Sequence, residues 1–368
     1  MSGGLLPEGF HDRLPPMAGA ASRLERAVLD VAHGHGYEQV DPPLAEFEDS
    51  FAARLKSGSA RDAVRFVDPV SQRTLAIRPD MTAQIGRIAA TRMGHHPRPV
   101  RLSYAGPVLK LRATELKPER AQRQIGVELI GLDSVAAARE VVTLAVEALR
   151  ATGVEDGIAI DFTLPDLIDI MAADTLTAAD FAALRDRLDA KDAAGVAAID
   201  ASYLPLIAAA GPFEPAMAKL RAISGDALAS RLDGLAAIAE GLGGDVAVTL
   251  DPTERHGFEY QRWFGFSLFL SGGRGPIGRG GAYTILRGDG SEEPAVGFSL
   301  YADAVLALGV GQDERRRLFL PIGTDPACAA ELRAAGWVTV QALDGDDTPE
   351  AQLCTHALRS GEPAAVNR

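Results

Sequence analysis

The sequence predicts an α+β fold in which helices flank an antiparallel sheet. Strand-like runs recur along the chain and are separated by turns of hairpin length, as is typical of antiparallel pairing. The clearest hairpin lies in residues 101–131, where two such runs flank a charged turn. One helical block, roughly residues 165–242, interrupts the strands, whereas a βαβ array would alternate strands and helices throughout.

The N-terminal segment is predicted to form a long helix and then a short strand. Apolar side chains recur at helical spacing in residues 15–36, and two glycines end the run. The strand begins at Tyr37 and stops at Pro42 and Pro43, since proline cannot donate a hydrogen bond to a sheet ladder.

A hairpin and a helix follow. Residues 65–68 and 74–77 are predicted to pair as strands, and the next helix starts at Thr82, with Asp80 or Thr82 as its cap. Residues 134–153 form the expected next helix, with a serine cap and a glycine stop. Further strands are expected at residues 157–164, 246–250, 258–270, 282–286 and 295–300.

The C-terminal part predicts a second, smaller domain. A strand, a helix and a strand fit residues 318–343, and the tail that follows is rich in Gly, Asp, Glu and Pro, which is typical of a mobile chain end. We therefore expect a large domain over residues 1–312 and a short remnant over residues 313–368.

Composition argues against several classes of partner. The chain of 368 residues is 47% hydrophobic and 24% charged, which is ordinary for a soluble protein. Its net charge of −13 repels polyanions, so we expect no nucleic-acid partner. No window reaches the roughly 18 apolar residues of a membrane span, so we expect no membrane association and a cytoplasmic location.

Metal and nucleotide cofactors are not expected. The two cysteines, Cys328 and Cys354, lack CxxC spacing, and the histidines that lie close together have no third ligand. Gly273–Gly278 matches the GxGxxG string, but a strand follows it and Pro276 interrupts it, whereas a dinucleotide site needs a helix there.

A set of polar residues on strands suggests a small cationic ligand. Gln124 and Glu128 lie four apart on one face of a strand, with Gly126 leaving space between them. Asp80 and Thr82 follow another strand, and a buried carboxylate can accept protons from an ammonium or an imidazole. The residues alone leave a second interpretation open, in which this is a solvent-exposed face and Gly126 marks a bulge.

Several of these segments resemble histidyl-tRNA synthetase, a class II aminoacyl-tRNA synthetase. The resemblance covers roughly residues 5–310 and implies that family's antiparallel sheet. It also implies that Asp80, Thr82 and Gln124 hold the α-amino group of histidine, while Glu128 and Tyr260 surround its imidazole. The matching segments are Leu6–Asp12, Ile77–Thr82, Gln124–Glu128, Gly257–Tyr260 and Pro294–Phe298.

The chain departs from this family at the arginines that handle ATP. Where the resemblance implies arginine, this sequence has Lys110, His256, Ala282 and Ala304. Removing one group that stabilises developing charge costs about a hundredfold or more in rate, so we expect no adenylation. The C-terminal remnant is also shorter than a full anticodon-binding domain.

This pattern resembles the regulatory subunits of ATP phosphoribosyltransferase, which are paralogues of the synthetase. The resemblance implies a non-catalytic chain that binds histidine, activates a short catalytic subunit at the first step of histidine biosynthesis and contributes to feedback inhibition. It also implies a dimer within a hetero-octamer. The alternatives are an active histidyl-tRNA synthetase and a synthetase-like ATP-dependent ligase.

Overall fold

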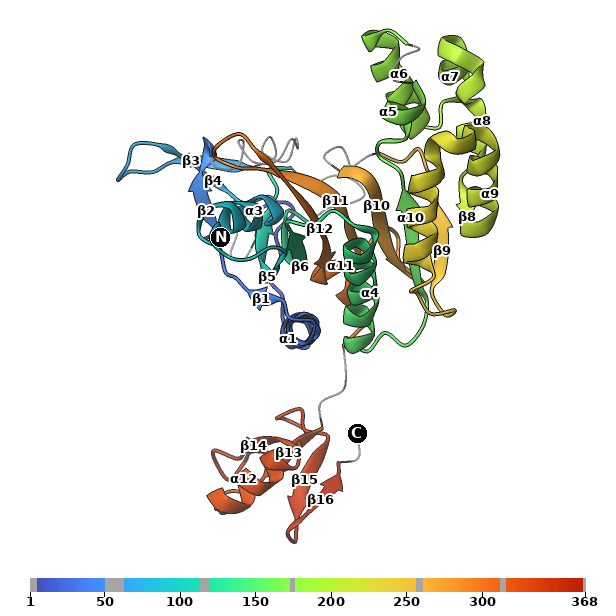
Figure 1. The fold of residues 1–368 in the computed structure, drawn as a ribbon. Helices are drawn as coiled ribbons and strands as arrows, with labels where there is room; N and C mark the ends of the chain where they lie inside the picture. Colours follow the sequence, from blue (N-terminus) through green and yellow to red (C-terminus); the bar gives the residue numbers. More distant parts are fainter. Residues whose placement is uncertain are drawn as a thin grey trace. The chain divides into compact units, whose positions relative to one another are not determined.

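The computed structural model describes residues 5–49, 63–112, 119–172, 176–255, 261–311 and 316–366. The chain divides into two compact units, residues 1–311 and residues 312–368. The first unit is built on a nine-stranded sheet with helices packed against it (Figure 1). Among the described residues, no helix is long and apolar enough to cross a membrane.

The sheet has the strand order β1-β5-β6-β12-β11-β10-β7-β9-β8. Neighbours from β5 through to β7 are antiparallel, whereas β1 pairs with β5 and β7 with β9 in parallel. The strands are β1 Glu38–Gln39, β5 Val100–Leu109, β6 Ala121–Ile130, β7 Ile158–Thr163, β8 Gly211–Pro212, β9 Ala247–Leu250, β10 Gln261–Leu270, β11 Gly278–Leu286 and β12 Glu292–Tyr301.

The predicted antiparallel sheet flanked by helices is therefore confirmed, with parallel pairs only near its two ends. Two strands are longer than predicted: β11 begins at Gly278 rather than residue 282, and β12 at Glu292 rather than residue 295. Glycine and glutamate have low strand propensity, so these ends are not visible in the local pattern. They form because the neighbouring strand pairs with them.

The two faces of the sheet pack against different helices. Alternation along β6 directs Ile125, Val127 and Leu129 into the main core, which includes residues of α1 (Met17–Gly34) and α4 (Val135–Ala151). The opposite face packs on a second core that includes residues of α3 (Thr82–Thr91). A short helix, α11 (Ala302–Leu306), follows β12 at the end of this unit.

The predicted helix caps have different outcomes. The Ser134 hydroxyl accepts a hydrogen bond from the Ala137 amide at 3.2 Å, so the serine cap of α4 is confirmed. Helix α3 runs Thr82–Thr91 with Met81 at its N-cap, so the predicted cap at Asp80 or Thr82 is wrong. Asp80 nevertheless accepts a hydrogen bond from the Thr82 amide at 2.7 Å, because its side chain folds back over the first turn.

The predicted helical insertion is confirmed, except that it also contains one short strand, β8 (Gly211–Pro212). Among the described residues of this segment, six α-helices and two 3-10 helices follow β7. The two-residue strand β8 lies between them and extends the sheet beside β9. The helices are α5 Leu167–Ala172, α6 Ala178–Asp189, α7 Ala193–Asp200, η2 Ala201–Tyr203, α8 Leu204–Ala208, α9 Phe213–Ser224, η3 Gly225–Leu228 and α10 Ala229–Ala239.

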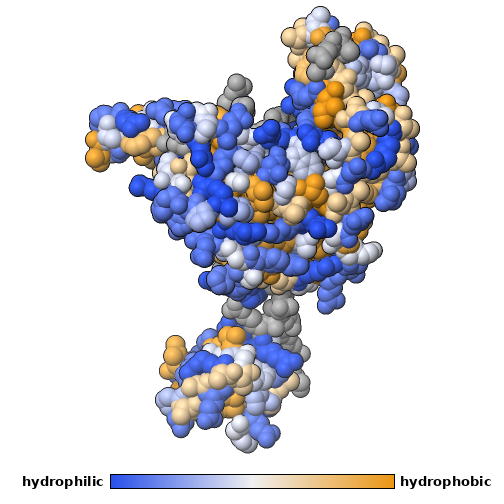
Figure 2. Space-filling model, in the orientation of Figure 1, coloured by the Kyte–Doolittle hydropathy of each residue, from blue (hydrophilic) through white to orange (hydrophobic). Residues whose placement is uncertain are grey.

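A three-stranded sheet of order β2-β4-β3 contains the predicted hairpin. Its strands are β2 Ala45–Phe47, β3 Val64–Val67 and β4 Thr74–Ile77. The β3–β4 hairpin projects from the first unit, and hydrophobic side chains lie toward its end (Figures 1 and 2). Val67 is 62% exposed and Val70 is 90% exposed.

The second unit is a four-stranded sheet of order β14-β13-β15-β16 with one helix. Strand β13 (Arg317–Leu320), α12 (Pro326–Ala334) and β14 (Val338–Gln341) form the predicted strand–helix–strand segment, with the two strands parallel. The predicted mobile tail is wrong, because β15 (His356–Arg359) and β16 (Glu362–Ala365) extend the sheet. Each has only four residues, too few for a clear periodic pattern.

Candidate functional site

Polar side chains gather on the sheet face that α3 covers. Gln124 and Glu128 of β6 lie on this face and are 0% and 2% exposed, so the solvent-exposed interpretation is wrong. Gly126 lies between them and pairs with Tyr104 of β5 and Ser299 of β12. The register continues through Gly126 on both sides, so the glycine marks no bulge.

The space at Gly126 is filled by a tyrosine. A Cβ atom at Gly126 would lie 2.5 Å from the hydroxyl of Tyr104 and 2.4 Å from the carbonyl oxygen of Phe298. The glycine therefore lets the Tyr104 ring cross β6 between Gln124 and Glu128. The expected free space between the two polar groups is occupied by a third polar group.

Glu128 accepts hydrogen bonds from two buried tyrosines. The Tyr104 hydroxyl lies 3.0 Å from Oε1, and the Tyr283 hydroxyl lies 2.8 Å from Oε2. Burial raises the pKa of Glu128 to about 8, although both hydrogen bonds act in the opposite direction. A cation placed beside this carboxyl group would favour its ionised form, so the site is suited to an ammonium or an imidazolium.

Asp80, Thr82 and Gln124 form a connected group next to Glu128. The Gln124 side-chain nitrogen donates to Asp80 Oδ2 at 2.8 Å and to Ser299 Oγ at 2.7 Å. Its oxygen accepts from the Met81 amide at 3.0 Å. The Gln124 amide is thus held at both ends, which fixes the start of α3, including Thr82, against the sheet.

Tyr104 joins this group to Glu128. Its hydroxyl lies 2.9 Å from Ser299 Oγ and 3.5 Å from Thr82 Oγ1, in addition to its bond to the carboxyl group. Buried polar networks of this kind are rigid when every member has a partner. The four described residues of the predicted site therefore belong to one hydrogen-bonded network.

A small pocket that is partly open to solvent lies beside the network. Of the predicted residues, Thr82 and Glu128 line it. Asp80 and Gln124 do not, but Gln124 donates hydrogen bonds to Asp80 and to Ser299, which does line it.

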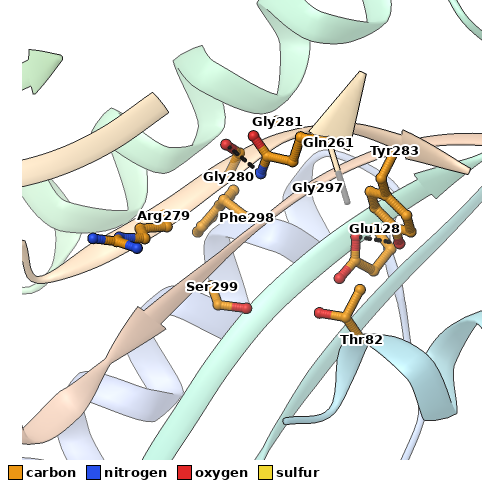
Figure 3. A pocket seen from close by; sticks show the side chains of 10 residues that line it. All are labelled: Thr82, Glu128, Gln261, Arg279, Gly280, Gly281, Tyr283, Gly297, Phe298 and Ser299. Carbon is orange, nitrogen blue, oxygen red and sulfur yellow. Dashed lines mark hydrogen bonds between the residues drawn. The ribbon is translucent and has the colours of Figure 1, made fainter. Parts of the chain in front are cut away.

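Glycines give this pocket its room. A Cβ atom at Gly297 would lie 1.8 Å from Glu128 Oε2, and one at Gly281 would lie 2.3 Å from the side-chain oxygen of Gln261. Figure 3 shows Glu128 and Tyr283 at one end of the pocket. A larger residue at either glycine would displace a side chain that lines the site.

Tyr260, the fifth predicted residue, lies outside the described residues, as does His256. Gln261, which follows Tyr260 in the sequence, lines the pocket. Its side-chain nitrogen donates to the Gly280 carbonyl at 2.9 Å. The resemblance implies a second tyrosine at this position. The glutamine instead fastens the start of β10 to β11.

Three of the four positions where the resemblance implies arginine are described. The Lys110 ammonium lies 5.8 Å from the centre of the Tyr301 ring. Ala282 is 4% exposed within the main core, and Ala304 packs against the same core. None of these three described side chains is a guanidinium, and no group of His, Cys, Asp or Glu among the described residues could hold a metal ion.

Sequence reasoning did not identify Tyr104 or the pocket-lining residues Tyr283, Ser299 and Arg279 as part of this site. Tyr104 and Tyr283 did carry a signal, since each is a tyrosine within a largely apolar strand, and a buried tyrosine hydroxyl usually has a hydrogen-bond partner. Their common partner was hidden, because the pattern within one strand does not specify which strands lie beside it.

Comparisons with known proteins bear on the family and the fold of this chain. The family model for histidyl-tRNA synthetase matches residues 9–305. The chain is 43% identical over 366 residues to the ATP phosphoribosyltransferase regulatory subunit of Rhodospirillum centenum. The match covers 97% of this chain and 93% of the relative.

Solved structures share the fold. The ATP phosphoribosyltransferase regulatory subunit/histidyl-tRNA synthetase from Bacillus halodurans has a TM-score of 0.78 at 20% identity, with 95% of each chain covered. The HisG:HisZ complex of ATP phosphoribosyl transferase from Thermotoga maritima contains a chain with a TM-score of 0.59 at 17% identity, covering 77% of this chain and 97% of that chain. The chain therefore belongs to the histidyl-tRNA synthetase-like family of ATP phosphoribosyltransferase regulatory subunits.

Proposed function

We propose that this chain is the non-catalytic regulatory subunit of an ATP phosphoribosyltransferase, the enzyme of the first step of histidine biosynthesis. The observation that carries the proposal is the 43% identity, over nearly the whole chain, to a relative that bears this name. The chain activates a short catalytic subunit and contributes to its inhibition by histidine. A cytoplasmic location belongs to the same proposal.

The absence of catalysis is supported by the positions that lack arginine. Ala282 and Ala304 contribute no charge, and a lysine ammonium at Lys110 cannot bind a phosphate in the bidentate manner of a guanidinium. When a carboxylate oxygen attacks the α-phosphate of ATP and pyrophosphate leaves, negative charge develops that needs such groups. We expect pyrophosphate exchange with histidine and ATP to stay at background.

Histidine is the ligand that we propose for the pocket. Glu128, held by two tyrosines, is suited to the imidazole, and the Asp80, Thr82 and Gln124 group is suited to the α-ammonium. Tyr260, which lies outside the described residues, belongs to the proposed site through the family resemblance.

The proposed partners are the short catalytic subunit and further copies of this chain, as a dimer within a hetero-octamer. The solved complex from Thermotoga maritima supports the first of these partners, because its fold-matched chain is part of a HisG:HisZ assembly. No metal, cofactor, nucleic acid or membrane enters the proposal.

Mixing the purified chain with a short catalytic subunit tests the proposal. Phosphoribosyl transfer should rise well above that of the catalytic subunit alone, and light scattering should detect a complex of both chains. The same preparation should show no exchange of pyrophosphate. If instead it exchanges pyrophosphate robustly with histidine, the chain is a histidyl-tRNA synthetase or a related ligase, and if neither activity appears the regulatory role is wrong.

A further inference from the structure

The pocket has a basic end as well as an acidic end. Arg279 of β11 pairs with Ser299, and Ser299 pairs with Gly126 of β6, so all three side-chain positions share one face of the sheet. Glu128 lies two residues further along β6. Strand spacings place the Cα atoms of Arg279 and Glu128 about 12 Å apart.

Arg279 and Glu128 both line the pocket, and Figure 3 shows them at opposite ends with Ser299 between them. The Arg279 charge reaches the acidic groups around it. Burial and then Asp80 raise the pKa of Tyr301, and the Arg279 charge opposes both; burial likewise raises the pKa of Glu254, and Arg279 opposes it. The pocket therefore combines a guanidinium at one end with a carboxyl group at the other.

Such a pair of ends matches a free amino acid, which carries a carboxylate and at least one cationic or proton-donating group. We propose that Arg279 binds the α-carboxylate of the ligand while Glu128 binds its other end, so that Arg279 makes the pocket specific for an amino acid with an unmodified carboxylate. This proposal rests on the histidine site proposed above.

The chemistry of the two roles gives a reason for an arginine here. An enzyme that activates an amino acid must leave one carboxylate oxygen free to attack a phosphate. A chain that only senses the amino acid can instead bind the carboxylate, and a guanidinium does so with two parallel hydrogen bonds. Arg279 precedes Gly280, Gly281 and Ala282, the segment in which the implied catalytic arginine is replaced by alanine.

Calorimetry with histidine and histidinol tests the proposal, because histidinol keeps the amine and the imidazole but has no carboxylate. The wild-type chain should bind histidinol about 10- to 100-fold more weakly than histidine, as expected for the loss of a charged hydrogen bond. In Arg279→Gln, the affinity for histidine should fall to that for histidinol, and the difference between the two ligands should vanish.

Arg262→Gln is the matched control. It makes the same change of charge on the neighbouring strand β10, where the Arg262 guanidinium donates to Thr284 Oγ1 at 3.1 Å outside the pocket lining. Both affinities should stay within about twofold of the wild type, since the charge is exposed and screened. A similar loss in this control would overturn the assignment to Arg279.

The remaining outcomes are also decisive. Equal affinity of the wild-type chain for the two ligands overturns the proposal without using any variant, so it stays testable even if Arg279→Gln fails to fold. If Arg279→Gln still binds histidine more tightly than histidinol, the proposal is overturned as well. If the wild-type chain binds no histidine, both this proposal and the histidine site are wrong, whereas activation of the catalytic subunit reports separately on the regulatory role.

Discussion

The protonation of Glu128 links the pocket to the stability of the whole chain. Its pKa rises from an ordinary value of 4.5 to about 8 because the carboxyl group is buried. At a pH between 4.5 and about 8, Glu128 keeps its proton in the folded chain and loses it in the unfolded chain. The stabilising contribution is therefore fully present below about pH 4.5 and is lost as the pH rises through about 8.

The variant Glu128→Gln should remove this pH dependence. From about pH 5 to about pH 9, the wild-type chain should lose about 3 to 5 kcal/mol more free energy of unfolding than the variant, at 1.36 kcal/mol per unit of pKa shift. Urea denaturation at a series of pH values measures the difference. Glu155→Gln, at an exposed position, should follow the wild type, and parallel profiles for wild type and Glu128→Gln would contradict the prediction.

Gly297 gives a second test at the scale of one residue. In Gly297→Ala, the new methyl group would lie 1.8 Å from Glu128 Oε2 and 2.4 Å from the carbonyl oxygen of Val127, so the carboxyl group must move. We expect a loss of about 1 to 3 kcal/mol in stability and at least about tenfold in histidine affinity. Gly288→Ala, where no atom lies within 4 Å of the added carbon, should change neither. Unaltered histidine binding by Gly297→Ala would remove Glu128 from the site.

At the scale of elements, Arg78 fixes the segment that carries Asp80 and Thr82. Its side chain is 2% exposed, and its guanidinium donates to the carbonyls of Pro107 and Pro42, each at 2.8 Å. Three segments that are distant in sequence thus meet at one cation: the end of β5, the loop before β2 and the start of α3. Burial lowers the pKa of the guanidinium, but the group remains charged.

Replacing this cation by the smaller one in Arg78→Lys should loosen the junction. A single ammonium cannot span both carbonyls, so at least one buried acceptor loses its partner, at a cost of about 2 to 4 kcal/mol. Chemical denaturation measures the loss, and calorimetry should show weaker histidine binding because α3 is displaced. The exposed Arg359→Lys should stay within about 0.5 kcal/mol of the wild type. Equal stability of the two variants would show that the junction does not depend on the guanidinium.

Local pattern predicts much of the sheet and part of the site. Period two along β6 correctly placed Gln124 and Glu128 on one face without knowledge of neighbouring strands. It could not supply Tyr283, which bonds to Glu128 from 155 residues away, since pairing between distant strands is not contained in either strand alone. The cap of α3 was misplaced for a related reason, because the Gln124 amide fixes Met81 from another element.

At the scale of the whole molecule, each unit has its own core. In the second unit, Phe319, Ala342, Cys354 and Ala357 form one cluster, and Leu318, Leu320 and Ala329 form another, all within residues 312–368. The pocket and its network lie wholly within residues 1–311. We predicted a domain boundary at residue 312, and that boundary stays a prediction.

A chain that ends at Gly311 should therefore fold and bind histidine within about twofold of the full-length affinity. Circular dichroism and calorimetry measure both properties. Activation of the catalytic subunit by the same truncated chain would show whether the second unit takes part in assembly. Loss of cooperative unfolding on truncation would mean that the first unit depends on the second, contrary to this prediction.

The placement of β12 next to β6 has a consequence for synthesis in the cell. The bonds that Ser299 makes to Gln124 and Tyr104 close over 175 and 195 residues. A nascent chain on the ribosome therefore exposes β5 and β6, with their buried glutamate and glutamine, until nearly the entire first unit has emerged. Contacts of such long sequence separation form slowly. The proposed histidine site is complete only once β12 has emerged, so histidine should bind chains that extend past Ser299 and not shorter nascent chains.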